Sequence, residues 1–167
     1  DADGITSVVI LFKFLNELPS SVSYYIPDRL DEGYGLKKPV IDKFKRENIS
    51  LIITVDCGVS DIEQIAHAQM LGIDTIVLDH HEISASLPCA AATINPNRSD
   101  CNFPFKDLAG VGIAYNFLIA LRGALRKEGF WENENYPNLK EYLDIVALGT
   151  IGDIAPLIDE NRIFTKI

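Results

Sequence analysis

Residues 75–81 read Thr-Ile-Val-Leu-Asp-His-His, and this stretch decides how the chain is interpreted. A short apolar run such as Thr75–Leu78 is typical of a strand buried inside a parallel sheet. An aspartate and two adjacent imidazoles follow it directly, and they include two of the three histidines in the chain. The stretch therefore predicts a strand whose carboxyl end carries a metal ligand or a catalytic group.

The segments on either side alternate between strand-like and helix-like patterns. Further strands are predicted at Val22–Ile26, Leu51–Val55 and Ala91–Ile94, and Leu51–Val55 is apolar enough to be buried on both faces. Helices are predicted at Ile5–Leu18, Pro39–Glu47, Ser60–Leu71 (opened by a Ser60–Glu63 capping box) and Leu139–Leu148, and a long helix follows the turn-rich Asn95–Asp107 and runs to about Lys127. Strands separated by helical crossovers predict an α/β fold: a doubly wound, mostly parallel, Rossmann-like sheet with helices on both faces.

Composition limits the classes of protein that need to be considered. A chain of 167 residues with 47% hydrophobic content can bury one substantial core, so we expect one domain. Three cysteines without CxxC spacing favour a reducing, cytoplasmic location over a disulfide framework. The longest apolar stretch, Leu108–Leu121, is too short and interrupted for a membrane span. The net charge of −9 is unusual for a nucleic-acid binder, but bound divalent cations would offset it locally.

Acidic residues recur at the ends of the predicted elements. In parallel sheets, ligands bind outside the carboxyl ends of the strands, which is where Asp56 and Asp79-His80-His81 lie. Asp1-Ala-Asp3-Gly4 precedes the first helix, and Gly152-Asp153 follows the last predicted one. Carboxylate oxygens suit Mg²⁺ and Mn²⁺, and imidazole shifts the preference toward Mn²⁺. Together these clusters predict a site for two divalent cations.

Each acidic cluster also has an ordinary structural explanation. Asp1 and Asp3 are good candidates for a helix N-cap, and Asp56-Cys57-Gly58 is good turn chemistry. Gly152-Asp153 is equally common in turns, and His67, inside a predicted helix, is expected to be structural. Only the combination of the clusters favours a metal site.

The ordered set of motifs resembles the DHH phosphoesterase superfamily. The matching motifs are Asp1-Ala-Asp3-Gly4, Glu32-Gly33-Tyr34-Gly35, Asp56-Cys57-Gly58, Asp79-His80-His81 and Gly149-Thr150-Ile151-Gly152-Asp153. Within the superfamily, three further motifs are similar to the RecJ-type single-strand-specific 5′→3′ exonucleases: Tyr25-Ile-Pro-Asp-Arg29, Ile94-Asn-Pro-Asn-Arg98 and Leu108-Ala-Gly-Val-Gly112. The resemblance covers nearly the whole chain.

This resemblance implies roles for individual residues. One cation would be held by Asp1 and Asp56, and the other by Asp3, Asp56, His80 and Asp153, so that Asp56 bridges the two. The other implied roles are contact with the scissile phosphate or protonation of the leaving group for His81, support of the ligands for Asp79, and binding of a substrate phosphate for Arg29. A surface salt bridge from Arg29 to a neighbouring acid explains that residue equally well.

The function implied is metal-dependent phosphodiester hydrolysis with Mn²⁺ or Mg²⁺. The expected substrate is the 5′ end of single-stranded DNA, in DNA repair and recombination, where other repair proteins are potential partners. Two cations can stabilise both the attacking and the leaving oxygen of such a reaction.

The superfamily pattern also includes parts that this sequence does not show. Its members have a strand ending in His before the first Asp-x-Asp, and a basic, glycine-rich C-terminal domain that binds substrate. We therefore expect this chain to be the catalytic core of a longer protein, with its first strand missing.

Two alternatives remain open at the level of sequence. One is another DHH phosphoesterase: an inorganic pyrophosphatase, or a phosphodiesterase of oligonucleotides or cyclic dinucleotides. The other is a metal-free binding module with the same fold. Retention of Asp1, Asp3, Asp56, His80 and Asp153 argues against the binding module, because a scaffold does not need all of these residues.

Overall fold

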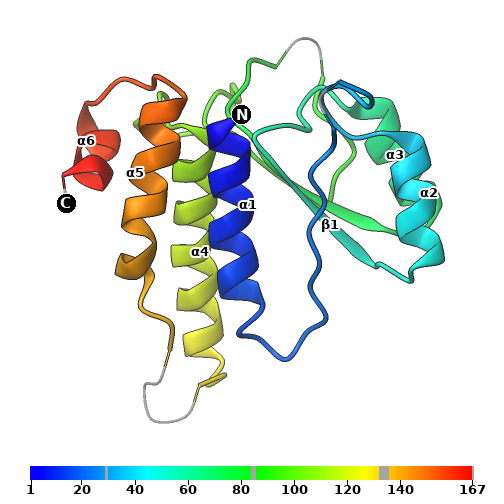
Figure 1. The fold of residues 1–167 in the computed structure, drawn as a ribbon, viewed down its shortest axis with the longest axis horizontal. Helices are drawn as coiled ribbons and strands as arrows, with labels where there is room; N and C mark the ends of the chain where they lie inside the picture. The colour runs from blue at the N-terminus through cyan, green and yellow to red at the C-terminus, as the bar shows by residue number, and fades with distance from the viewer. Residues whose placement is uncertain (29, 84–85, 132–135, 167) are drawn as a thin grey trace. The chain divides into compact units, whose positions relative to one another are not determined.

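The protein forms two compact units in the computed structural model, which describes residues 1–28, 30–83, 86–131 and 136–166. Unit 1 comprises residues 1–24 and 108–167, and unit 2 comprises residues 25–107. Unit 2 contains a parallel sheet with helices, and unit 1 is helical (Figure 1). The predicted α/β class with a parallel sheet is confirmed.

Within the described residues, the sheet of unit 2 consists of three parallel strands in the order β1-β2-β3. They are β1 (Leu51–Val55), β2 (Asp74–Leu78) and β3 (Ala92–Ile94), close to the predicted segments. The register pairs Val55 with Leu78 and Leu78 with Ile94. The last residues of all three strands therefore lie in one row, and the chain leaves each strand at the same edge of the sheet.

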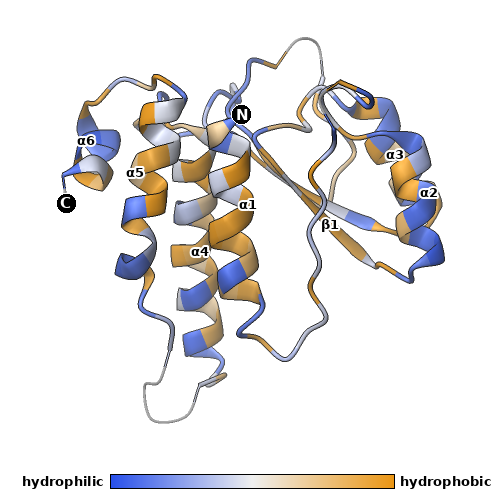
Figure 2. Cartoon of the chain, in the orientation of Figure 1, coloured by the Kyte–Doolittle hydropathy of each residue, from blue (hydrophilic) through white to orange (hydrophobic). Residues whose placement is uncertain are grey.

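Burial along β1 alternates, so the prediction of a strand buried on both faces is wrong. Ile52 and Thr54 are buried, whereas Leu51 is 45% exposed. The buried face packs with helices α2 (Lys38–Arg46) and α3 (Ile62–Met70). The resulting core comprises Ile41, Ile52, Ala68 and Ile73. Figure 2 shows mixed hydrophilic and hydrophobic residues on α2 and α3, as expected for helices with one buried side.

The helices of unit 2 begin differently from one another. α2 has Pro39 in its first turn, as predicted. The predicted capping box at Ser60–Glu63 is wrong, because the N-cap of α3 is Asp61. The Asp61 carboxylate accepts a hydrogen bond from Leu36 N at 2.8 Å, so it anchors a different loop rather than its own helix.

The predicted strand at Val22–Ile26 is also wrong. These residues are described but form neither strand nor helix. β-Branched and aromatic side chains favour an extended backbone, but a strand also needs a hydrogen-bonding neighbour, and β1, β2 and β3 pair with one another.

Unit 1 is built from helices, of which α1, α4 and α5 run side by side (Figure 1). Its elements are α1 (Ala2–Leu15), α4 (Gly110–Lys127), the 3₁₀ turn η2 (Leu139–Tyr142), α5 (Leu143–Gly152) and α6 (Asp159–Thr165). α1 begins and ends three residues before the predicted bounds, and α6 was not predicted. α5 extends past the predicted end at Leu148 as far as Gly152.

Two glycines of α5 allow it to approach α1 closely. A Cβ at Gly149 would overlap Thr6 Oγ1 and would lie 2.8 Å from Val111 Cγ1. A Cβ at Gly152 would lie 2.7 Å from the Cβ of Ala2. The glycines are therefore positions of close packing between α5 and its neighbours. This packing places the end of α5 beside the start of α1.

Among the described residues, no helix combines the length and the apolar content that a membrane crossing requires.

The residue after Asp153 gives a prediction about stability. Ile154 is 89% exposed and has a φ of 58°, which a β-branched residue rarely adopts. Its N–H donates to Ile151 O, and the N–H of Ala155 donates to Thr150 O, a helix ending that usually carries glycine. Ile154→Gly should therefore raise the free energy of unfolding by about 1 kcal/mol in urea denaturation.

The matched control is Ile163→Gly, at a position that is 69% exposed and lies inside helix α6. Glycine should there lower the free energy of unfolding, by up to about 1 kcal/mol. A loss of stability in both variants would contradict the assigned strain at Ile154.

Candidate metal centre

Asp56 is the first residue after β1 and has an unusual backbone conformation. Its φ is 55°, in the left-handed region that aspartate tolerates better than most residues. The N–H of Asp56 donates to Leu78 O at 2.9 Å, and its carbonyl accepts from the hydroxyl of Tyr34. The side chain is buried, so its carboxylate needs polar or cationic partners.

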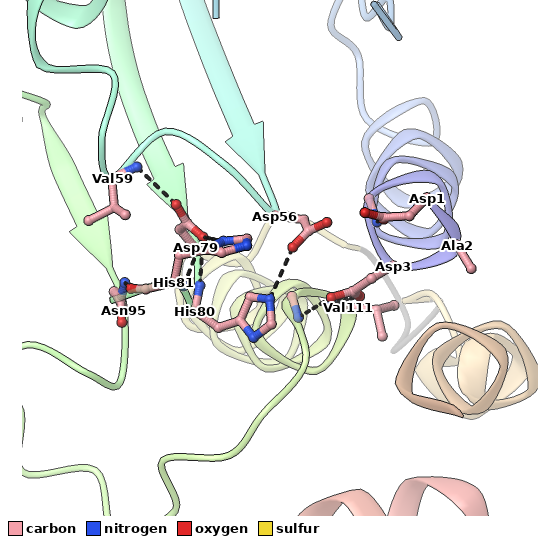
Figure 3. A network of polar contacts seen from close by, with 12 residues as sticks. Asp1, Ala2, Asp3, Asp56, Val59, Asp79, His80, His81, Asn95 and Val111 are labelled. Atoms are coloured by element: carbon pink, nitrogen blue, oxygen red, sulfur yellow. Dashed lines mark hydrogen bonds and ion pairs between the residues drawn. The ribbon is translucent and has the colours of Figure 1, made fainter. Parts of the chain in front are cut away.

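Two histidines that follow β2 lie beside that carboxylate. His80 Nε2 lies 3.1 Å from Asp56 Oδ1 (Figure 3). Asp56, His80 and His81 each offer a ligand atom, and these three atoms lie within 4.8 Å of one another. Such a group of one carboxylate and two imidazoles is able to hold a divalent cation.

Asp79 holds this group in place from below the surface. Only 1% of the residue is exposed, and its Oδ1 accepts from His80 N at 2.8 Å, His81 N at 3.1 Å and His81 Nδ1 at 2.7 Å. Its Oδ2 accepts from Val59 N at 2.9 Å (Figure 3). Burial acts to raise the pKa of Asp79, but these hydrogen bonds outweigh it and hold the pKa below its usual value.

His81 is oriented by the same carboxylate. With Nδ1 held by Asp79, the opposite nitrogen, Nε2, is the one that can face a ligand. The hydrogen bond to Asp79 raises the pKa of His81, although burial works against it. The ring stands edge-to-face with His80 and with Tyr34, at centroid distances of 4.7 and 5.9 Å.

Unit 1 carries the other acidic residues of the predicted set. Asp1 is the N-cap of α1 and accepts from Gly4 N at 3.1 Å. Asp3 lies in the first turn of α1, whereas the sequence analysis placed it before the first helix. Asp153 is the C-cap residue of α5, and a carboxylate oxygen of Asp153 lies within 4.8 Å of one of Asp3.

Asp3 has a second, structural task in unit 1. It is 1% exposed, and its two oxygens accept from Gly110 N at 2.6 Å and Val111 N at 2.7 Å (Figure 3). Asp3 thereby caps the N-terminus of α4, where Ala109 has no side chain to do so. Each carboxylate oxygen has a further lone pair, so this capping leaves room for a cation.

Two further residues named in the sequence analysis are Arg29 and His67. Arg29 lies outside the described residues. His67 Nε2 lies 2.7 Å from Asp42 Oδ1, an ion pair or hydrogen bond between α3 and α2 that fits the expected structural role.

Sequence reasoning assigned no role to the hydroxyl of Tyr34 or to the amides of Asn95 and Asn97. Asn95 Nδ2 donates to His81 O at 2.9 Å, and Asn97 Nδ2 donates to His80 O at 2.6 Å. Asn95 was detectable, because it follows β3 just as Asp56 and Asp79 follow β1 and β2. The hydroxyl of Tyr34 carried no such signal, since it comes from a loop.

The parallel sheet with an Asp-His-His at its carboxyl edge defines a known class. Residues 1–150 match the model of the DHH family, N-terminal domain, and the chain belongs to this family.

Within that family, the chain is similar to exonucleases named RecJ. The chain is 47% identical over 168 residues to the single-stranded-DNA-specific exonuclease RecJ of Escherichia coli, covering 99% of this chain and 29% of the relative. It is 41% identical over 167 residues to the RecJ of Bacillus subtilis, covering 100% of this chain and 20% of the relative. This chain thus spans less than a third of the length of these relatives.

Solved structures agree with the sequence comparison. A crystal structure of exonuclease RecJ bound to manganese matches with a TM-score of 0.84 at 34% identity, over 99% of this chain and 40% of that one. A structure of RecJ from Thermus thermophilus in complex with Mg²⁺ matches with a TM-score of 0.58 at 27% identity, over 99% of this chain and 18% of that one.

The four hydrogen bonds to Asp79 predict a large effect of its removal on stability. Asp79→Ala should lower the free energy of unfolding by about 3 kcal/mol, because buried donors including the N–H of Val59 lose their acceptor. Urea denaturation measures this, with Asp100→Ala as the control. Asp100 is exposed and pairs only at the surface with Arg98, so its loss should change stability little. Equal effects of the two substitutions would contradict the role of Asp79.

The lowered pKa of Asp79 also predicts a pH dependence. Its stabilisation is fully present above the unfolded value of about 3.9 and is lost as the pH falls through the lower folded value. Between about pH 5 and pH 2, the wild type should therefore lose more stability than Asp79→Asn, measured by urea denaturation at each pH. Parallel curves for the two proteins would show that the carboxylate is not stabilised by folding.

Proposed function

We propose that this chain is the catalytic core of a metal-dependent exonuclease that hydrolyses single-stranded DNA from its 5′ end. The observation that carries the proposal is the grouping of two proposed ligands, Asp56 and His80, with the proposed phosphate contact His81: one side-chain atom of each lies within 4.8 Å of the others. The names of the relatives supply the substrate class. A role in DNA repair and recombination in the cytoplasm, beside other repair proteins, follows from the same proposal.

The donor atoms fit Mn²⁺ or Mg²⁺. Carboxylate oxygen suits both ions, and imidazole nitrogen favours Mn²⁺. Burial, with the negative charge of Asp61 and Asp79, raises the pKa of the neighbouring Cys57 thiol to about 12. Without a bound metal, this thiol is therefore protonated at neutral pH.

The proposed ligands are Asp1, Asp3, Asp56, His80 and Asp153. Asp56 is assigned to both cations. When bound, two such cations neutralise the charge of a phosphodiester and lower the barrier to its hydrolysis.

The remaining residues act on the substrate or on the ligands. His81 presents Nε2 to the scissile phosphate or gives a proton to the leaving oxygen, since Asp79 holds Nδ1 and favours the protonated ring. Asp79 itself stays buried and orients both histidines. Arg29 is proposed to bind a substrate phosphate through its planar guanidinium.

The first test is the reaction itself. With Mn²⁺ or Mg²⁺, the whole protein should release nucleotides from the labelled 5′ end of single-stranded DNA and should leave a duplex intact, as read on a sequencing gel. Degradation from the 3′ end would overturn the polarity. Hydrolysis of pyrophosphate without attack on DNA would reassign the chain to another DHH phosphoesterase, and absence of Mn²⁺ binding in calorimetry would favour a metal-free binding module.

Asp56→Asn isolates the charge of the bridging carboxylate. Asparagine tolerates the left-handed backbone at this position, so the variant should fold. Activity should fall by more than about a hundredfold, beyond the range for groups that merely support a ligand. The exposed Asp100→Asn is the control and should keep full activity. Unchanged metal-dependent activity in Asp56→Asn would remove Asp56 from the mechanism.

A double-mutant cycle tests whether Asp3 and Asp56 serve the same ions. If they do, the losses of Mn²⁺ affinity in Asp3→Asn and Asp56→Asn should not add in the double variant. Additive losses, measured by calorimetry, would mean that the two residues bind independently.

A further inference from the structure

The backbone of His80-His81 belongs to no helix or strand, yet its polar groups are fully engaged. The N–H groups of both residues donate to Asp79 Oδ1. The carbonyl of His80 accepts from Asn97, and the carbonyl of His81 accepts from Asn95. Four backbone groups that would otherwise need a neighbouring strand are therefore satisfied by three side chains.

Asn95 is the buried half of this arrangement. It is 2% exposed and directly follows β3. Its Nδ2 donates to His81 O at 2.9 Å, while its Oδ1 accepts from the N–H of Asn97 at 2.7 Å. A carboxamide is required for this pair of bonds, because it donates at one end and accepts at the other, whereas a carboxylate only accepts.

Asn97 is the exposed half, and its Nδ2 donates to His80 O at 2.6 Å. Two positively charged side chains, Lys106 and Arg98, hold the loop that carries Asn97. Lys106 Nζ donates to Pro96 O at 2.7 Å and to Cys101 O at 2.8 Å. Arg98 Nη1 donates to Thr93 O at 2.6 Å. The two amides are therefore presented by a fixed backbone rather than by a loose loop.

We propose that Asn95 and Asn97 are positioning residues that fix the imidazoles of His80 and His81 by holding their two carbonyls. This inference rests on the proposed function, because it assigns the pair to the metal and phosphate contacts of that site. Asp79 restrains the same dipeptide through its N–H groups. With both sets of bonds in place, neither peptide plane can turn, and His80 Nε2 stays beside Asp56 Oδ1. Without the amides, the dipeptide is held on one side only.

Asn97→Ala is the sharpest variant, because an exposed residue can be truncated without opening a cavity. The control is Asn102→Ala, another exposed asparagine a few residues along the chain. Calorimetry should show Mn²⁺ binding weakened about 10- to 100-fold in Asn97→Ala and unchanged in Asn102→Ala. Thermal unfolding should shift little in either variant.

Asn95→Asp complements it with a change of nearly the same shape that replaces the donor to His81 O by a carboxylate oxygen and adds a negative charge. It should also weaken Mn²⁺ binding, and its kcat should fall more than its KM rises, because His81 is displaced. Hydrogen exchange of the His80 and His81 amides supplies a readout that needs no metal. Exchange should be faster than in the wild type in both Asn variants.

The possible results distinguish failure of the positioning role from failure of the proposed function. Wild-type Mn²⁺ affinity and kcat in both Asn97→Ala and Asn95→Asp would overturn the positioning role. Faster exchange with unchanged Mn²⁺ affinity would mean that Asn95 and Asn97 only stabilise the backbone of the loop. That result would also overturn the positioning role. If the wild type itself binds no Mn²⁺, the proposed function fails and takes this inference with it. That result is seen before any variant is measured.

Discussion

The carboxylate of Asp79 is almost fully buried and accepts hydrogen bonds from the backbone of two different loops. One is the turn after β1, through Val59, and the other is the segment after β2, through His80 and His81. A buried charge is costly unless such donors surround it, so folding of both loops and ionisation of Asp79 support each other. The arrangement of the candidate site in unit 2 depends on this one group.

The parallel register of the sheet brings further polar side chains to the edge where Asp79 lies. Because β1, β2 and β3 end in one row, the residues that follow them, Asp56, Asp79 and Asn95, emerge at the same edge. Asp56 offers its carboxylate to a cation, and Asp79 is the buried acceptor of the loop N–H groups. The amide of Asn95 holds the backbone of the histidines. The left-handed conformation of Asp56 is the kind of strain that functional sites retain.

The sequence predicted those elements whose signals are local. Apolar runs located β1 and β2, and the binding of ligands at the carboxyl edge of parallel sheets pointed to Asp56 and the histidines from the sequence alone. Errors arose where tertiary partners override local chemistry. Asp61 resembled part of a capping box, yet its carboxylate anchors Leu36. Asp3 pairs with the start of α4, more than a hundred residues away, and no spacing rule reveals such a contact.

The central claim is that Asp56 and His80 coordinate a divalent cation at the edge of the parallel sheet. The most direct measurement is a crystal structure of the protein soaked in Mn²⁺, with anomalous data collected at the manganese edge. The account predicts a peak within coordination distance of an Asp56 carboxylate oxygen and of His80 Nε2, with Asp79 outside the coordination sphere. A manganese peak bound elsewhere, with Asp56 and His80 still joined only to each other, would contradict it.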